Sequence, residues 1–228
     1  MLYLIPTPIG NLGDITSRSV AVLQEVDVIL AEDTRNSGRL LKHLGVSTPM
    51  LSYHAHNEHK KTADIIDQLK DGRKIGLISD AGTPAISDPG FLLVRACIQN
   101  DINISCLPGP NALIPALAIS GIPCDRFYFE GFLPHKKGRQ TRWQTLAQLN
   151  CTIALYESPH RLLKALNECL TFLGSDRYIA VIKEISKIYE SVYRGTPEQL
   201  IEQFKDGKIK GEYVIVIAAK GYDPDRVL

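Results

Sequence analysis

The sequence predicts an α/β protein with two α/β domains, the first built on a mostly parallel, helix-covered sheet and the second on a mixed sheet. Three observations predict this class. In the first half, short apolar runs typical of buried strands alternate with amphipathic helical patterns. The alternation pauses at residues 121–125, where we expect a junction between a domain of residues 1–121 and one of residues 122–228. Beyond it, two strand patterns follow each other too closely for a parallel crossover, which indicates an antiparallel pair.

The composition is typical of a globular protein without a membrane span. Of the 228 residues, 44% are hydrophobic and 22% are charged, and no apolar run approaches the roughly 20 residues that cross a bilayer. The first six residues lack the basic region of a signal peptide and resemble a strand, so we expect a cytoplasmic protein. The five cysteines include no C-x-x-C pair, which favours reduced thiols over a disulfide or zinc framework.

The elements of the first half follow from apolar runs and from the Gly, Pro and polar clusters that end them. Strands are expected at residues 2–6, 26–31, 50–53, 75–78 and 102–107. Helices are expected at about residues 15–24, 36–44, 91–99 and 112–120, and one more with Ile65, Ile66 and Leu69 facing inward. Gly45 is expected to stop the helix at 36–44, and Asp88 to cap the helix at 91–99.

The second half repeats the same kind of pattern with different spacing. Strands are expected at residues 127–132, 152–156, 178–182, 189–194 and 213–218, and helices at about 162–173 and 197–204. The strands at 178–182 and 189–194 form the expected antiparallel pair. Between the first two strands lies a basic stretch, residues 135–142, which we expect to be a loop with Trp143 beside it.

One connection is much longer than its neighbours. The strand at 75–78 runs into Ser79–Gly90, a stretch of small and polar residues with two glycines and two prolines, before the next helix begins. Most strand-to-helix loops in such folds have only a few residues. Because open α/β sheets bind ligands at the carboxyl ends of their strands, this loop predicts a binding site rather than an ordinary turn.

Six loop segments, taken together and in order, resemble a known family. They are Pro6–Asn11, Ala31–Arg35, Ser52–Glu58, Ser79–Gly90, Pro108–Ala112 and Tyr156–Arg161. They resemble the tetrapyrrole-methylase superfamily and, more narrowly, its branch of ribosomal RNA small subunit (cytidine-2′-O)-methyltransferases I. The resemblance covers essentially the whole chain. Members of that branch often continue into a small C-terminal extension, whereas this sequence stops at Leu228, and their usual Arg-Glu pair is Lys183-Glu184 here.

The resemblance implies S-adenosylmethionine as methyl donor, held in a cleft between the two domains, and a homodimer that methylates a ribose hydroxyl in small-subunit rRNA. By the same resemblance, the loop after residue 78 holds the methionine part of the cofactor, and further residues close the cleft. The cofactor-binding residues expected in this way are Pro8, Asp80, Ala81, Gly82, Ile86, Ser87, Ala112, Tyr156, Gly211 and Glu212. For Pro8, Gly82 and Gly211, turn geometry alone is the alternative explanation, and for Ala112 it is helix packing.

Methyl transfer to a ribose hydroxyl asks for little chemistry from the protein beyond alignment. A general base contributes roughly 10²- to 10⁴-fold, and alignment of the reactants contributes as much or more. Polar residues at strand ends supply the catalytic candidates, which are Glu32, Asn57 and Glu184. Three histidines lie within six residues at positions 54–59, but their spacing matches no known metal site, and we expect no metal.

RNA contact must come from local patches, because the net charge is only +1. Arg35, Arg39 and Lys42 or His43 form one basic stripe on a helix, Arg161 and Lys164 form a second, and residues 135–142 form a basic loop whose Trp143 could stack on a base. The expected RNA-binding residues are Arg35, Arg39, His54, Lys136, Lys137, Arg139 and Arg161. The alternative functions are a tetrapyrrole C-methyltransferase on the same scaffold and a non-catalytic RNA-binding module of ribosome assembly.

Overall fold

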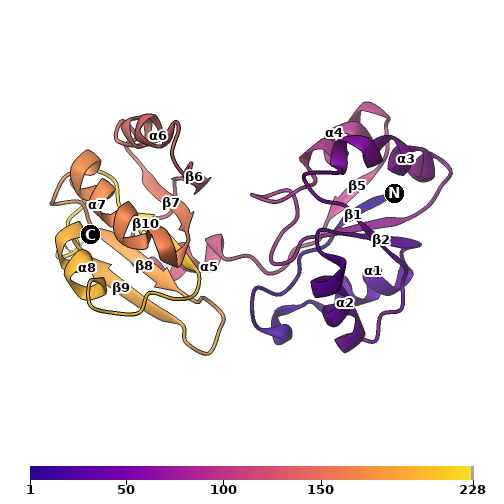
Figure 1. The fold of residues 1–228 in the computed structure, drawn as a ribbon, viewed down its shortest axis with the longest axis horizontal. Helices are drawn as coiled ribbons and strands as arrows, with labels where there is room; N and C mark the ends of the chain where they lie inside the picture. Colours follow the sequence, from indigo (N-terminus) through magenta and orange to yellow (C-terminus); the bar gives the residue numbers. More distant parts are fainter. Residues whose placement is uncertain (227–228) are drawn as a thin grey trace. The chain divides into compact units, whose positions relative to one another are not determined.

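The computed structural model describes residues 1–226, which form two compact units that divide between Asn111 and Ala112 (Figure 1). The division falls before the helix α5, Leu113–Ser120, rather than after it at residue 121. The reason is packing, because α5 lies against three strands of the second unit, β8 (Ile179–Lys183), β9 (Ser191–Gly195) and β10 (Tyr213–Ile217). No helix in the described part of the chain is both long and apolar enough to cross a membrane.

The first unit is built on a wholly parallel sheet. Its strands are β1 (Leu2–Leu4), β2 (Val28–Ala31), β3 (Met50–Ser52), β4 (Ile75–Ile78) and β5 (Ile104–Cys106). They lie in the order β3-β2-β4-β1-β5, and every neighbouring pair is parallel. The predicted parallel sheet is confirmed. Strands β2 and β4 are buried along their whole length, as apolar runs between two helical layers should be.

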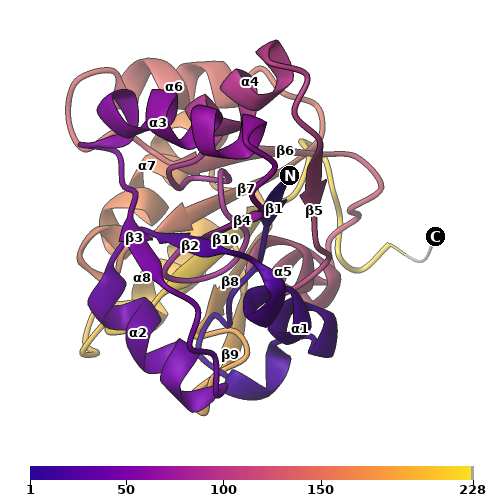
Figure 2. The same ribbon diagram turned by 90° about the vertical axis from the view of Figure 1, so that its right-hand side faces the viewer.

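Helices cover both faces of this sheet (Figure 1, Figure 2). They are α1 (Ser17–Glu25), α2 (Thr34–His43), α3 (Glu58–Lys70) and α4 (Phe91–Gln99), with a short 3₁₀ turn, η1, at Leu12–Asp14. The predicted inward residues of α3 are buried in a core that also includes Leu93 of α4, and α1 and α2 contribute Leu23 and Leu41 to a second core on the other face.

The start of α2 and the cap of α4 differ from the prediction. Helix α2 begins at Thr34 rather than 36, because the Asp33 carboxylate accepts a hydrogen bond from the Arg35 N–H and caps it. Helix α4 is not capped by Asp88. Gly90 occupies the N-cap position with φ +131° and no side-chain hydrogen bond.

The second unit has the predicted mixed sheet. Its strands are β6 (Phe127–Phe132), β7 (Thr152–Glu157), β8 (Ile179–Lys183), β9 (Ser191–Gly195) and β10 (Tyr213–Ile217). Their order is β6-β7-β10-β8-β9, with β6 and β7 parallel and the other pairs antiparallel. The antiparallel pair expected from the short spacing is β8 and β9.

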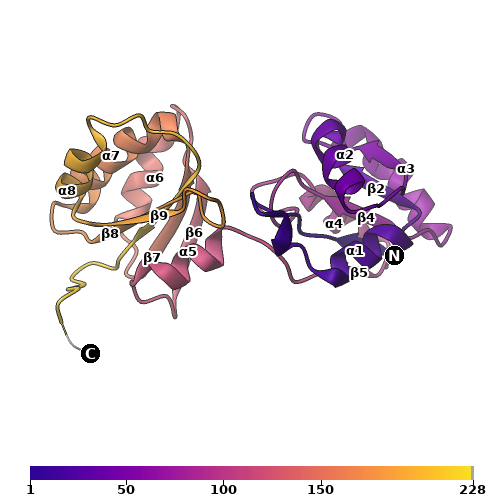
Figure 3. The same cartoon turned by 90° about the horizontal axis from the view of Figure 1, so that it is seen from below.

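Helices α6 (Arg139–Leu146), α7 (Leu162–Leu173) and α8 (Pro197–Phe204) pack on one face of this sheet and α5 on the other (Figure 3). A 3₁₀ turn, η2 (Pro159–Arg161), precedes α7. The basic stretch 135–142 is not wholly a loop, because α6 begins inside it at Arg139. Its buried residues Arg139, Trp143 and Leu146 recur at helical spacing, which places the first two in the interior.

Candidate functional site

The candidate site of the first unit lies where its parallel strands end. Because the sheet order places β3, β2, β4 and β1 side by side, the loops that follow these strands meet at one edge. The residues at these ends are Thr7 after β1, Glu32 and Asp33 after β2, His54 and Asn57 after β3, and Ser79 and Asp80 after β4. This is the edge at which the sequence predicts a binding site.

The loops after β1 and β4 are joined through their backbones. The Thr7 N–H donates to the Gly82 carbonyl at 3.0 Å, and the Gly82 N–H donates to the Thr7 carbonyl at 2.9 Å. The Thr7 hydroxyl also donates to the Ser79 carbonyl at 3.0 Å. Gly82 has φ +84°, a conformation that residues with a Cβ rarely adopt. The backbone geometry of Gly82 is therefore explained by this bridge.

Asp80 joins the loop after β4 to the start of α2. Its Oδ1 accepts a hydrogen bond from the Asp33 N–H at 3.2 Å, and its Oδ2 accepts one from the Asn36 side-chain amide at 3.0 Å. Two predicted segments, around residues 33 and 80, are thus locked to each other. The Asp80 side chain is exposed on the surface of the unit and is held in one orientation.

Three carboxyl groups lie close enough here to affect one another. Burial raises the pKa of Glu32, and the negative charge of Asp80 raises it further. Burial and the charge of Glu32 raise the pKa of Asp88 to about 6. A raised pKa means that the ionised form is disfavoured, so these carboxylates gain from a nearby cation. The edge is therefore an electronegative site suited to a positively charged group.

The tip of the loop has a strained backbone and an open surface. Ala85 and Ser87 have φ of +68° and +63° although neither is a glycine, and Ile86 between them is 50% exposed. A Cβ on Gly90 would lie 2.8 Å from the Leu77 side chain, so the end of the loop needs a glycine. Strained backbone of this kind is concentrated at ligand sites. The predicted contacts Ala81, Ile86 and Ser87 are all exposed.

His54 and Asn57 form one hydrogen-bonded unit after β3. The His54 N–H donates to Asn57 Oδ1 at 2.9 Å, and Asn57 Nδ2 lies 3.1 Å from His54 Nε2. Because an amide N–H can only donate, Nε2 accepts and the ring proton sits on Nδ1. That buried Nδ1 has no hydrogen-bond partner among the described residues. Asn57 thus fixes the orientation of the His54 ring.

In the second unit, Glu184, Gly211 and Glu212 come together. Glu184 Oε1 accepts from the Glu212 N–H at 2.9 Å and from Lys187 Nζ at 2.8 Å. Although burial pushes the pKa of Glu184 up, these two hydrogen bonds outweigh it and hold the pKa below its ordinary value. A Cβ on Gly211 would lie 2.6 Å from the Glu184 side chain. Because this carboxylate is already hydrogen-bonded and weakly basic, the geometry argues against the predicted base role of Glu184.

The remaining predicted cofactor residues lie in different local settings. Pro8 is half-buried in the loop after β1, and Ala112 is the N-cap residue of α5. The Tyr156 ring packs against Phe129 and Phe132 with ring centroids 5.0 and 5.5 Å apart. The described residues contain no group of three or more His, Cys, Asp or Glu side chains placed to hold a metal ion.

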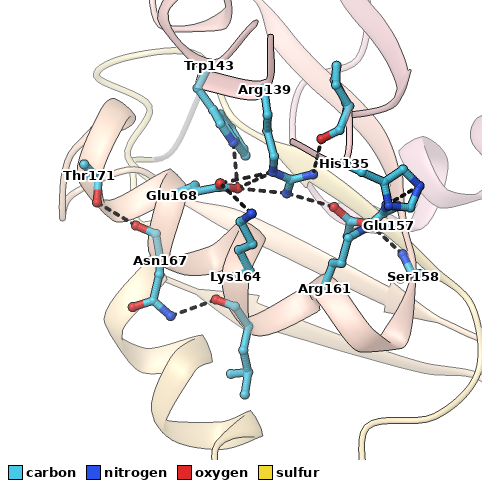
Figure 4. Close-up of polar contacts among 12 residues, drawn as sticks. His135, Arg139, Trp143, Glu157, Ser158, Arg161, Lys164, Asn167, Glu168 and Thr171 are labelled. Carbon is cyan, nitrogen blue, oxygen red and sulfur yellow. Dashed lines mark hydrogen bonds and ion pairs between the residues drawn. The ribbon is translucent and has the colours of Figure 1, made fainter. Parts of the chain in front are cut away.

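The predicted RNA-binding residues divide into exposed and buried members. Arg35, Arg39, Lys136 and Lys137 are exposed, and Arg35 forms an ion pair with Asp33 at 2.8 Å. The prediction was wrong for Arg139, whose side chain is only 3% exposed and pairs with Glu157 and Glu168 (Figure 4). It was also wrong for Trp143, which is fully buried and cannot stack on a base.

Arg161 lies between these extremes. Its side chain is 15% exposed and its Nε donates to Glu157 Oε1 at 2.7 Å. Sequence reasoning missed the partners of these arginines, Glu157 and Glu168. The signal that could have found them is the helical spacing of residues 139, 143 and 146, which turns Arg139 inward and requires a buried anion near it.

Comparisons with known proteins agree with the fold. Residues 1–201 match the family model of the tetrapyrrole (corrin/porphyrin) methylases. A Synechocystis sp. protein named ribosomal RNA small subunit methyltransferase I is 51% identical over 96% of this chain and 78% of the relative. The Escherichia coli O157:H7 protein of the same name is 44% identical over 95% of this chain and 77% of the relative.

Solved structures are more distant in sequence and show the fold alone. A diphthine synthase aligns with a TM-score of 0.76 at 13% identity, covering 97% of this chain and 91% of the other. A cobalt precorrin-4 methyltransferase aligns with a TM-score of 0.68 at 20% identity, covering 95% and 94%. With a family model that spans most of the chain and relatives at 44–51% identity, the chain belongs to the tetrapyrrole (corrin/porphyrin) methylase family and, within it, groups with the ribosomal RNA small subunit methyltransferases I.

Proposed function

We propose that this chain transfers a methyl group from S-adenosylmethionine to the 2′-hydroxyl of a cytidine ribose in small-subunit ribosomal RNA. The observation that carries the proposal is the near full-length similarity to relatives named ribosomal RNA small subunit methyltransferase I. The cofactor follows from the family, whose members are S-adenosylmethionine-dependent methyltransferases. The ribose 2′-oxygen and the cytidine are the finer part of the proposal.

The residues at the edge of the first sheet fit the charge of the cofactor. S-Adenosylmethionine carries a sulfonium and an ammonium group. Glu32, Asp80 and Asp88 supply negative charge whose mutual repulsion a cation relieves. Asp80, Ala81, Gly82, Ile86 and Ser87 are the residues that would hold the methionine end. Pro8, Ala112, Tyr156, Gly211 and Glu212 remain further predicted contacts.

When bound, the cofactor supplies an electrophilic methyl group, and the protein must present the ribose oxygen in line with it. The hydroxyl is a weak nucleophile, so removal of its proton helps. Glu32 is the strongest remaining candidate for the proton acceptor, because burial and the charge of Asp80 raise its pKa and make it more basic than an ordinary carboxylate. Asn57 holds the His54 ring, and His54 orients the RNA or its own loop.

The proposal extends to a homodimer in the cytoplasm. The homodimer is what the family resemblance implies. The compartment follows from the proposed substrate, because the enzyme must meet ribosomal RNA. Size-exclusion chromatography with light scattering tests the oligomeric state, and a mass equal to one chain at micromolar concentration contradicts it.

One experiment separates the proposal from its alternatives. The protein is incubated with S-adenosylmethionine carrying a labelled methyl group, together with small ribosomal subunits, free small-subunit rRNA or a precorrin mixture. Labelled RNA is digested to nucleosides and the product is identified by mass spectrometry. Labelled 2′-O-methylcytidine supports the proposal. Label on the macrocycle supports a tetrapyrrole C-methyltransferase, and RNA binding without cofactor binding supports an assembly module.

A further inference from the structure

A buried network of charges lies beneath the basic segment of the second unit. The Arg139 side chain is 3% exposed and lies between the carboxylates of Glu157 and Glu168 (Figure 4). Its Nη2 is 3.0 Å from Glu157 Oε2, and its Nε is 2.8 Å from Glu168 Oε2. Trp143 donates its indole N–H to the same Glu168 oxygen at 2.9 Å. The network thus ties α6 to the end of β7 and to α7.

The same network also contacts the first residues of the segment that precedes α6. Arg139 Nη1 donates to the Pro134 carbonyl at 3.2 Å. Arg161, whose Nε is bound to Glu157, places its Nη1 2.7 Å from His135 Nδ1. The other end of the segment is Arg139 itself, where Gly138 with φ +83° turns the chain into the helix. Residues 134–138, which we call the basic segment, are therefore fixed at both ends.

The charges of the network cancel, and those of the segment do not. Arg139 and Arg161 are matched by Glu157 and Glu168, which leaves the interior neutral. Lys136 and Lys137 are exposed on the segment itself. Lys164 of α7 is half-exposed, and its ammonium lies 3.9 Å from Glu168, a contact at the outer limit of an ion pair. The surface over the neutral interior is therefore positive.

A network of this kind does more for geometry than for stability. Well-packed apolar side chains of the same volume often stabilise a fold as much as a buried ion-pair network does, so the best-attested benefit of such a network is a fixed arrangement. Arginine suits that purpose, because its planar fork binds two carboxylates in defined directions. Here the fork fixes the backbone of a segment whose own side chains point to solvent.

Building on the proposed function, we propose that the Arg139–Glu157–Glu168 network is a positioning device that holds Lys136 and Lys137 against phosphates of the substrate RNA. Lysine ammonium groups are point charges that bind phosphate without reading the base. The segment therefore contributes affinity and register, and it leaves the choice of nucleotide unchanged. The buried residues Arg139, Glu157 and Glu168 act only through the segment.

The first measurement compares two pairs of lysines in the same unit. The K136A/K137A variant is compared with K208A/K220A, which removes the same number of exposed charges from other elements. Binding to a small-subunit rRNA transcript is followed by fluorescence anisotropy across a salt series. Loss of two phosphate contacts should lower the slope of log K against log salt by about 1.4. With equal binding of the variant and the natural protein at about 1 M salt, this difference in slope makes the variant bind roughly 25-fold more weakly at about 0.1 M salt. The control pair should change neither.

The second measurement tests whether the network acts through the lysines. Glu168→Gln keeps the side-chain shape but removes the negative charge that faces Arg139. It is measured alone and in the K136A/K137A background. Positioning predicts that E168Q weakens RNA binding more than about threefold in the natural sequence and has no such effect when the lysines are absent, which is non-additivity beyond the usual scatter. A merely structural role predicts equal effects in both backgrounds and overturns the proposal.

Folding is monitored in the same samples. Trp143 is the single tryptophan of the chain and donates to Glu168, so its emission reports on the network directly. S-Adenosylmethionine affinity should be unchanged in E168Q. If that variant shows the emission of an unfolded chain, Arg161→Lys, which alters the more exposed arginine of the network, takes its place in the cycle.

The outcomes separate this proposal from the proposed function. If the natural protein leaves rRNA unmethylated, the proposed function fails whatever the lysines do. If it methylates rRNA and K136A/K137A binds the transcript with an unchanged salt slope, the positioning proposal fails alone. An unchanged slope together with weaker binding to a ribosomal protein fraction would indicate an acidic protein partner and would also overturn it.

Discussion

The two polar regions of this molecule use charge in opposite ways. At the strand ends of the first unit, Glu32, Asp80 and Asp88 lie near one another, and the pKa values of Glu32 and Asp88 rise because burial and the neighbouring negative charges oppose ionisation. In the second unit, Arg139 and Arg161 are matched one for one by carboxylates, and each carboxylate oxygen has a donor nearby. One region has an unbalanced charge, and the other is neutral.

The backbone follows the same division. The loop of the first unit has two non-glycine residues with positive φ, Ala85 and Ser87, and carries an exposed Ile86 at its tip. The network of the second unit is built from regular elements, with Glu157 on a strand and Arg139 and Glu168 on helices. Strain and unbalanced charge mark a surface that gains from a ligand, whereas balanced buried charge marks a support. The strand ends of the first unit therefore have the properties expected of a binding site, and the network of the second unit has those expected of a scaffold.

The largest effect is expected from breaking the balanced network. Arg139→Met leaves Glu168 and Glu157 without their shared buried partner, and removal of one member of a buried pair lowers the free energy of unfolding by about 3–5 kcal/mol. Urea unfolding followed by Trp143 fluorescence measures the change.

A surface ion pair provides the control for that loss. Lys205 and Glu202 form an exposed pair on and just after α8, and Lys205→Met should lower the free energy of unfolding by less than about 1 kcal/mol. Equal losses in the two variants would mean that the Arg139 network stabilises the fold no more than a surface ion pair does.

An intermediate effect is expected from the strained loop. Gly90→Ala places a Cβ 2.8 Å from the Leu77 side chain at φ +131°, which should lower the free energy of unfolding by about 1–3 kcal/mol. Because Gly90 ends the loop, S-adenosylmethionine binding measured by calorimetry should weaken as well. Gly207→Ala, where nothing lies within 4 Å of the added Cβ and φ is ordinary, should change neither quantity. An equal loss in Gly207→Ala would mean that the strained loop is not the cause of the loss in Gly90→Ala.

The smallest effect is expected from the unbalanced charge, and it depends on pH. A carboxyl whose pKa is raised from 3.8 to about 6 binds its proton more tightly in the folded state, so stability is lost as the pH rises from about 4 through about 6. Asp88→Asn should therefore increase the free energy of unfolding at pH 7. Two pKa units correspond to roughly 3 kcal/mol, and solvent screening at this partly exposed group reduces the gain to about 1 kcal/mol.

The same variant should give no gain near pH 4, where the natural carboxyl is already protonated in the folded state. Urea unfolding at the two pH values measures the difference. A gain that is the same at pH 4 and pH 7 would show that Asp88 does not carry the repulsion described above.

Most of the fold could be predicted from the sequence, because strands and helices here follow local apolar patterns. The buried strand β4, the inward residues of α3 and the antiparallel β8 and β9 pair are confirmed. Helix ends were less predictable. Asp is a common capping residue, but Gly90 with its positive φ occupies the N-cap position in place of Asp88.

Residues of the candidate site could be predicted only where their position at the end of a strand places them there. Glu32, Asp80 and Asn57 lie at strand ends, as the pattern indicates. Arg139 shows the limit, because a basic residue among lysines looks exposed until its helical phase and its distant partner Glu168 are known. Contacts between residues far apart in the sequence, such as Glu184 with Gly211, leave no local pattern from which to predict them.

The place of β1 in the first sheet has a consequence for synthesis of the chain. This strand is made before both of its neighbours in the sheet, β4 and β5, which follow about 70 and 100 residues later. At roughly 5–20 residues per second, the ribosome needs about 5–20 s to supply both partners. During that time the apolar side chains of Leu2 and Leu4 have no sheet to join. The centre of the first sheet is therefore completed only after β5 has been made.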